Sequence, residues 1–156
     1  MNNPALGLLA AGTVIPAIPL VLDEQRHFNE AGQRRLVRYY LAAGAVGLAV
    51  AVHTTQFEIR KPEIGLFEPV LRLVADEIDR YEQKTGRIIV RIAGVCGPAG
   101  QAVKEAQTAA RLGYHAALLS PGGLSACSED DLVVRTEQVA RIMPVIGFYL
   151  QPAVGG

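Results

Sequence analysis

The sequence predicts an α/β fold built on a parallel sheet, and three observations carry that prediction. Apolar segments that fit buried strands alternate with segments of helical periodicity along the whole chain. The loops between them are short, and glycines follow several of the helical segments. This alternation is typical of strand–helix–strand units with right-handed crossovers.

Five buried strands are expected. The first covers residues 13–22, and the second is the uninterrupted apolar run at residues 47–52. The other three are expected at residues 88–95, 115–120 and 144–150. A continuous apolar run is typical of a parallel strand that is covered on both faces. We expect a single domain over residues 1–156, with residues 1–12 as a loosely attached arm.

Four helices are expected between these strands, at residues 29–43, 61–85, 100–112 and 129–142. Asn29 is a good N-cap for the first helix, and Ser128 with Asp131 resembles a capping box for the fourth. In the second helix, Pro62 and Glu63 fit a first turn, where a missing N–H is tolerated and a negative charge is favourable.

Composition narrows the class of partner. Fifteen basic residues balance fifteen acidic ones, so there is no net field to attract nucleic acid or an anionic membrane. A small molecule or another protein is the expected partner. Cys96 and Cys127 lack metal-ligand spacing and are too few for a disulfide scaffold, which fits a reducing, cytoplasmic location. Residues 5–22 carry no charge, but Pro16 and Pro19 argue against a membrane span.

The apolar run at residues 47–52 ends abruptly in His53, Thr54 and Thr55, which we interpret as part of a functional site. A polar loop that merely caps a strand is the alternative. Chemical groups also follow the other expected strands, at residues 20–23, 96–97, 120–123 and 149–152. In a barrel, parallel strands direct these ends to one mouth. The hydroxyl, thiol, imidazole and phenol groups there suit covalent or acid–base chemistry, and no metal or cofactor is expected.

Two architectures fit the pattern: a doubly wound sheet and the first part of a closed barrel. A dinucleotide-binding fold should carry a glycine-rich turn after the first strand, but residues 23–27 contain no glycine. This absence weakens the doubly wound alternative.

Five motifs occur in the order and spacing of one enzyme family. They are TVIPA at 13–17, Ala43-Gly44 with Thr54-Thr55, AGV at 93–95, GYHAALL at 113–119 and PVIGFYLQP at 144–152. The chain thereby resembles the dihydrodipicolinate synthase and N-acetylneuraminate lyase family, in its N-terminal part. The resemblance implies a (β/α)₈ TIM-type barrel, of which this chain holds about the first five strands and four helices.

The resemblance also implies a function. The family contains class I aldolases and lyases that act on pyruvate-type 2-oxo acids through a lysine Schiff base. Thr54 and Thr55 match the threonine pair that holds the substrate carboxylate and relays a proton, and Tyr149 matches the tyrosine that completes the relay. His53 would then line the substrate site. Family resemblance further suggests a homo-oligomer, either a dimer or a tetramer.

The chain departs from the family pattern at several positions. His53 replaces a glycine, Gln56-Phe57 replaces Gly-Glu, and Gly122-Gly123 stands where a synthase has paired tyrosines. Val154 stands where a synthase has an arginine for the second substrate. An amino-dicarboxylate would have little to bind, so we expect a different acceptor or a retro-aldol cleavage.

The Schiff-base lysine of the family follows a sixth strand, beyond these residues. The three lysines of this chain, Lys61, Lys84 and Lys104, fall in helical segments where a solvated ammonium is expected. We therefore expect the lysine to come from a complementary segment, either a continuation of the chain or a partner. That segment would also cover the exposed strand edges of an incomplete barrel. The alternative is a non-catalytic protein that binds a keto acid or serves in an assembly.

Three further residues keep open interpretations. His53 either orients a substrate oxygen or bonds a neighbouring carbonyl. Cys96 is either a nucleophile paired with His53, as in a thiol hydrolase, or a buried inert thiol. Arg91 lies inside an expected strand, and a paired charge is its plain explanation.

Overall fold

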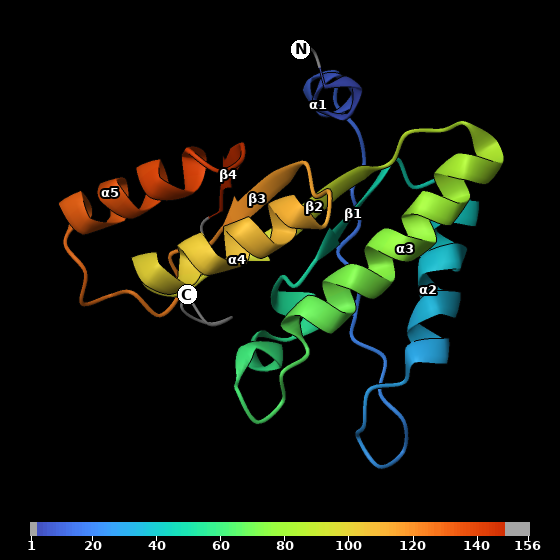
Figure 1. The fold of residues 1–156 in the computed structure, drawn as a ribbon, viewed down its shortest axis with the longest axis horizontal. Helices are drawn as coiled ribbons and strands as arrows, with labels where there is room; N and C mark the ends of the chain where they lie inside the picture. The colour runs from blue at the N-terminus through green and yellow to red at the C-terminus, as the bar shows by residue number, and fades with distance from the viewer. Residues whose placement is uncertain (1–2, 149–156) are drawn as a thin grey trace. The chain divides into compact units, whose positions relative to one another are not determined.

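The computed structural model describes residues 3–148, and the chain divides into two compact units, Met1–Arg91 and Ile92–Gly156. From α2 onward helices and strands alternate along the chain, and the strand order in the sheet is β1-β2-β3-β4 (Figure 1). The predicted α/β alternation is therefore confirmed, with different bounds for several elements.

The first unit contains helices α1 (Pro4–Ala10), α2 (Glu30–Ala42) and α3 (Phe67–Thr85), the strand β1 (Gly47–Val50) and the start of β2 (Val90–Val95). Two short 3₁₀ turns, η1 (His53–Thr55) and η2 (Phe57–Arg60), follow β1. Helices α2 and α3 lie side by side and contact each other (Figure 1). Val37 and Leu41 of α2 and Val70, Val74 and Ile78 of α3 are completely or almost completely buried.

The second unit contains the rest of β2, followed by α4 (Ala99–Arg111), β3 (Ala116–Leu119), α5 (Glu129–Ala140) and β4 (Val145–Gly147). Strand β3 pairs with β2 and with β4, in parallel in both cases. All six residues of β2 are buried, as expected for a strand covered on both faces. Ser128 and Asp131 form the predicted capping box of α5.

The prediction of a first strand at residues 13–22 is wrong. This segment makes a single parallel bridge, from Ala17 to Ala49, and an antiparallel bridge from Leu22 to Phe28. The Ile18 N–H donates to the Ala49 carbonyl, and the Ala49 N–H donates to the Pro16 carbonyl. Pro16 and Pro19 have no N–H to donate, so a longer ladder cannot form.

The predicted start of the second helix at Pro62 is also wrong. Residues 61–64 form a turn, and α3 begins at Phe67. Gly65 separates the two with φ 60°, a left-handed conformation that interrupts a helix. At the other end Gly86 closes α3 in the left-handed conformation, as the sequence indicates.

Residues 3–12 of the expected N-terminal arm include α1, a helix that was not expected from the sequence. The Asn3 side chain caps this helix by accepting from the Ala5 N–H, and Ala5 is buried. Over residues 3–148 the structure has five α-helices and four strands, where four helices and five strands were expected.

Candidate functional site

Residues 51–55 turn sharply where β1 ends. Ala51 has φ 60°, which is strained for a residue with a Cβ, and His53–Thr55 then form η1. Two side chains hold Ala51 in place. Its N–H donates to Thr55 Oγ1 at 3.1 Å, and its carbonyl accepts from Arg60 Nη2 at 2.9 Å. The turn is therefore fixed by its own side chains.

Thr55 is fully buried, and its hydroxyl has a structural task. It donates to the Ile18 carbonyl at 2.7 Å while it accepts from the Ala51 N–H. A hydroxyl has one proton to donate, so the donor of Thr55 is already in use. Thr55 thus joins the extended segment before α2 to the turn after β1.

His53 and Thr54 are exposed, in contrast to Thr55. The His53 ring lies 5.7 Å from the Phe57 ring, centroid to centroid, in a tilted arrangement. Within the described part of the chain, the Thr54 hydroxyl and the His53 imidazole have no hydrogen-bond partner. Both groups can therefore meet a solute that approaches the end of β1.

Tyr149, the third predicted catalytic residue, lies outside the described residues, as does Val154. The relay from Thr54 and Thr55 to Tyr149 stays a prediction.

Arg60 is a residue of this site that sequence reasoning missed. Besides bonding the Ala51 carbonyl, its guanidinium lies over the Phe67 ring at 4.8 Å and near the Phe57 ring at 5.7 Å. These contacts place a positive charge within the turn that follows β1. The position of Arg60 in the sequence does not predict its bond to the Ala51 carbonyl, because that bond depends on the η1 and η2 turns, which only the structure shows.

In the second unit, Arg135 joins the ends of two strands. It projects from α5, only 4% of the residue is exposed, and it donates to the Gly97 carbonyl at 2.7 Å and to the Ser120 carbonyl at 2.9 Å. Burial lowers the pKa of Arg135, while Cys96, Glu105 and Cys127 oppose that shift. A guanidinium stays charged nonetheless. Arg135 lies four residues before Val139, on the same buried side of α5. This spacing in the sequence could have indicated a buried arginine.

Cys96 follows β2 directly and lies beside polar groups of α4. Its N–H donates to Glu105 Oε2 at 3.2 Å, and Gln101 Nε2 lies 3.9 Å from its sulfur. Gln101 also donates to Glu105 Oε1 at 2.7 Å. Glu105 is buried, and Cys96 is half-buried. The inert-thiol and nucleophile interpretations of Cys96 both stay predictions.

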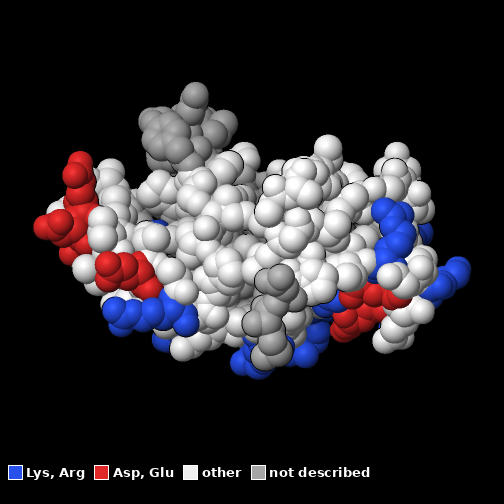
Figure 2. Space-filling model, turned by 90° about the horizontal axis from the view of Figure 1, so that it is seen from above, with Lys and Arg blue, Asp and Glu red and all other residues white. Residues whose placement is uncertain are grey.

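A hollow of about 390 Å³ lies beside the ends of β3 and β4. Its lining includes Leu119, Pro121, Arg135, Thr136, Val145 and Phe148. Phe148 is 39% exposed, so an apolar surface meets solvent at this edge of the second unit. Both signs of charge occur on the face drawn in Figure 2, and neither sign dominates it.

The three lysines are all exposed. The prediction of a paired charge for Arg91 is confirmed: its Nη2 contacts Asp79 at 2.5 Å and Glu82 at 2.6 Å.

Among residues 3–148, His, Cys, Asp and Glu side chains do not form a group of three or more that could hold a metal ion. No helix in this range combines the length and apolar character needed to cross a membrane.

The parallel sheet and the helices between its strands define the fold class: an N-terminal portion of a (β/α)₈ barrel. No family model matches the sequence. Two curated relatives are each named probable 5-dehydro-4-deoxyglucarate dehydratase. The protein from Ectopseudomonas mendocina is 28% identical over 123 residues, which cover 79% of this chain and 38% of the relative. The protein from Delftia acidovorans is 29% identical over 120 residues, which cover 76% of this chain and 36% of the relative.

Solved structures agree on the fold. YagE of E. coli K12, a prophage protein of the dihydrodipicolinic acid synthase family solved with pyruvate, superposes with a TM-score of 0.76 at 22% identity. The alignment covers 92% of this chain and 46% of YagE. N-acetylneuraminate lyase from Mycoplasma synoviae gives a TM-score of 0.73 at 18% identity, over 88% of this chain and 46% of the lyase.

These comparisons confirm the resemblance to the dihydrodipicolinate synthase and N-acetylneuraminate lyase family and the partial-barrel fold class. The chain spans less than half the length of the relatives that it matches.

Proposed function

We propose that this chain is the N-terminal part of a lyase or aldolase that acts on a pyruvate-type 2-oxo acid through a Schiff base. The similarity to proteins named as dehydratases, over three quarters of the chain, carries the proposal. In this scheme the complete protein works as a cytoplasmic homo-oligomer, a dimer or a tetramer, on a small-molecule substrate.

The end of β1 is the part of the site that the described residues supply. His53 and Thr54 are exposed there and can bind the carboxylate of a 2-oxo acid. Thr55 acts by holding the turn, because its hydroxyl is already bonded to Ile18 and Ala51. The family resemblance implies a proton relay among Thr54, Thr55 and Tyr149; we propose that Tyr149 and Thr54 exchange the proton and that Thr55 supports the turn that carries Thr54.

The Schiff-base lysine is proposed to lie outside these 156 residues. A nucleophilic amine must be deprotonated, which needs desolvation or a neighbouring cation to lower its pKa. The three lysines of this chain are exposed, so none has a desolvated setting. A complementary segment would supply the lysine and cover the apolar hollow at the ends of β3 and β4.

A second candidate is a non-catalytic protein that binds a keto acid or serves in an assembly. The bonded hydroxyl of Thr55 and the exposed lysines favour it, because neither group is ready to transfer a proton or attack a ketone. The two candidates make different predictions about covalent chemistry.

Trapping with borohydride in the presence of pyruvate separates them. A Schiff base forms when an amine adds to the ketone and water leaves, and borohydride reduces the imine to a stable secondary amine. We expect the complete protein to gain a pyruvate-derived adduct by mass spectrometry, and residues 1–156 alone to gain none. Saturable pyruvate binding without an adduct would support the second candidate. No binding would refute both the lyase and the keto-acid-binding protein and would leave the assembly role alone.

Two further readouts test the parts of the proposal. Thr54→Val should lower the adduct yield about tenfold or more, since it removes a hydrogen bond to a charged group. Ser125→Ala is a matched loss of an exposed hydroxyl and should leave the yield unchanged. An adduct on Lys61, Lys84 or Lys104 would refute the external lysine. A monodisperse monomer with the intact mass of residues 1–156 would refute the complementary segment.

A further inference from the structure

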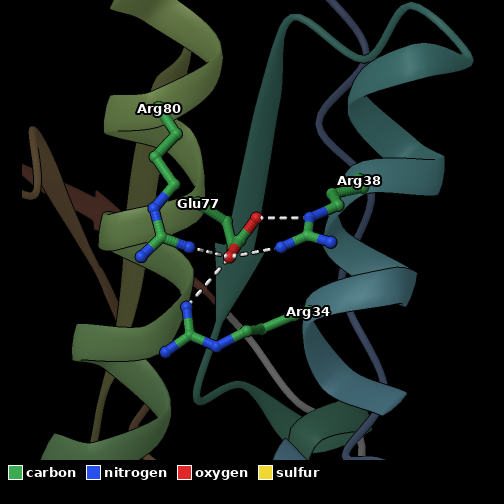
Figure 3. Close-up of polar contacts among 4 residues, drawn as sticks. All are labelled: Arg34, Arg38, Glu77 and Arg80. Carbon is green, nitrogen blue, oxygen red and sulfur yellow. Dashed lines mark hydrogen bonds and ion pairs between the residues drawn. The ribbon is translucent and has the colours of Figure 1, made fainter. Parts of the chain in front are cut away.

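Three arginines converge on one buried carboxylate between α2 and α3 (Figure 3). We name this group the arginine cluster: Arg34 and Arg38 of α2, Arg80 of α3, and Glu77 of α3 at its centre. Glu77 is 3% exposed. Its Oε1 accepts from Arg34 at 2.9 Å, from Arg38 at 3.1 Å and from Arg80 at 2.8 Å, and its Oε2 accepts from Arg38 Nε at 2.7 Å.

The charges of the cluster do not balance. Three guanidinium groups share one carboxylate, which leaves two positive charges in excess. The nearest other acids along the helices do not correct this. Among the described residues, neither Glu30, one turn before Arg34, nor Asp76, one turn before Arg80, makes an ion pair with the cluster. Asp79 and Glu82 are paired with Arg91 instead.

The cluster also keeps hydrogen-bond donors to spare. Within residues 3–148, Arg34 Nε and Nη2, Arg38 Nη1, and Arg80 Nε and Nη2 have no hydrogen-bond partner. The side chains of Arg38 and Arg80 are 59% and 61% exposed, and that of Arg34 is 26% exposed. Glu77 already accepts four hydrogen bonds from the cluster, so the spare donors are available to an anionic ligand.

Glu77 fixes the three guanidinium groups in place before any ligand arrives. All three lie within hydrogen-bond distance of one carboxylate, so their planar ends are held a few ångströms apart. Holding long side chains in one arrangement removes part of the entropy that binding would otherwise cost. Planar forks of N–H groups match the oxygens of phosphate and carboxylate.

We propose that the arginine cluster is a binding site for a tetrahedral oxyanion of the phosphate class. Two excess charges within a few ångströms match a dianion centred on one atom better than an acidic peptide, whose charges are spread along a chain. The site lies between α2 and α3 and is independent of the chemistry proposed for the end of β1. A free phosphate and the phosphate group of a small organic ester present the same chemistry to it.

Calorimetric titration of the full 156-residue chain tests the proposal. Sodium phosphate, glycerol 3-phosphate and glycerol are titrated at neutral pH, with sodium chloride keeping the ionic strength constant. We expect saturable binding of one phosphate per chain and no binding of glycerol. Tighter binding of glycerol 3-phosphate than of phosphate would identify an ester as the ligand, and the reverse would identify the free anion.

Arginine-to-glutamine variants locate the site. The double variant Arg38→Gln with Arg80→Gln should weaken phosphate binding at least about tenfold, because charge-assisted hydrogen bonds are lost. Arg72→Gln removes a similarly exposed arginine of α3 that pairs with Glu68 outside the cluster, and it should change binding less than about twofold. The single variants Arg38→Gln and Arg80→Gln each remove one charge, as Arg72→Gln does, and each should weaken binding more than Arg72→Gln does. Equal effects of the three single variants would overturn the proposal.

A conservative variant guards against misfolding. Arg38→Lys with Arg80→Lys keeps the charge and removes the planar forks. We expect this double lysine variant to keep the helical circular dichroism spectrum of the parent chain, which shows that it folds, and yet to lose most phosphate binding. Unchanged phosphate binding by this variant would show that positive charge alone is enough, and it would overturn the proposal. Absence of phosphate binding above the chloride background would also overturn it.

Discussion

Thr55 and Ile18 are joined by a buried hydrogen bond of 2.7 Å, from the threonine hydroxyl to the isoleucine carbonyl. The same hydroxyl accepts from the Ala51 N–H, so one side chain connects the segment before α2 to the turn after β1. This places Thr55 in the framework of the candidate site, beneath the exposed Thr54 and His53.

Thr55→Val keeps the shape of the side chain and removes the hydroxyl. It leaves the buried Ile18 carbonyl and Ala51 N–H without this partner, so the free energy of unfolding should fall by about 1–3 kcal/mol. Urea denaturation measures the change. Thr54→Val, on the exposed side of the same turn, is the control and should stay within about 0.5 kcal/mol of the parent chain. Equal losses in both variants would contradict the structural role of Thr55.

Glu77→Gln should destabilise the first unit because it leaves three guanidinium groups around an uncharged amide. Breaking a buried ion pair by removing one partner lowers the free energy of unfolding by about 3–5 kcal/mol. Because Arg38 and Arg80 are exposed and stay solvated, we expect a loss at the lower end of this range. Glu63→Gln makes the same chemical change on an exposed turn and should be nearly neutral. Thermal unfolding of both variants distinguishes the two sites.

The stability that Glu77 provides should depend on pH. Hydrogen bonds from Arg38 lower the pKa of Glu77, burial opposes that shift, and Arg34 adds to the lowering. A lowered folded-state pKa stabilises the protein above the unfolded-state pKa, and the stability is lost as the pH falls through the folded-state value. The parent chain should therefore lose stability on acidification more steeply than Glu77→Gln. The free energy of unfolding of both proteins is measured as a function of pH. Parallel pH curves would contradict the lowered pKa of Glu77 in the folded state.

Gly47→Ala should disturb the contact between β1 and the start of β2. A Cβ on Gly47 would lie 2.7 Å from the Val90 carbonyl oxygen and 2.8 Å from the Val90 Cβ, so the two segments must move apart. The expected loss is about 1–3 kcal/mol in the free energy of unfolding. Gly100→Ala in α4 meets no atom within 4 Å and should be neutral or slightly stabilising. A neutral Gly47→Ala would contradict the close approach.

Arg135→Met keeps a long side chain and removes the guanidinium that bonds the Gly97 and Ser120 carbonyls. Those carbonyls lose charge-assisted hydrogen bonds, so the free energy of unfolding should fall by about 2 kcal/mol or more. Arg141→Met, at the exposed end of α5, should change it by less than about 0.5 kcal/mol. The Ser120 N–H donates to the Val95 carbonyl, and its hydrogen exchange should become faster only in the Arg135 variant.

The sequence by itself determined the α/β alternation, the resemblance to an aldolase family, the capping of α2 and α5, and the pairing of Arg91 with acidic groups. Those features depend on local periodicity, on side chains three or four residues apart, or on the cost of an unpaired buried charge. The sequence also marked His53–Thr55 as a polar strand end, and the structure places that turn directly after β1.

Only the tertiary structure decided which of those polar groups is available. Thr54 and Thr55 are neighbours of the same type, yet one is exposed and the other is bonded to a carbonyl 37 residues earlier in the chain. The hydrogen bonds from Arg34 and Arg38 to Glu77, and those from Arg135 to the carbonyls at two strand ends, likewise join residues far apart in sequence. Local patterns cannot encode such contacts, because they form only when helices and strands pack together.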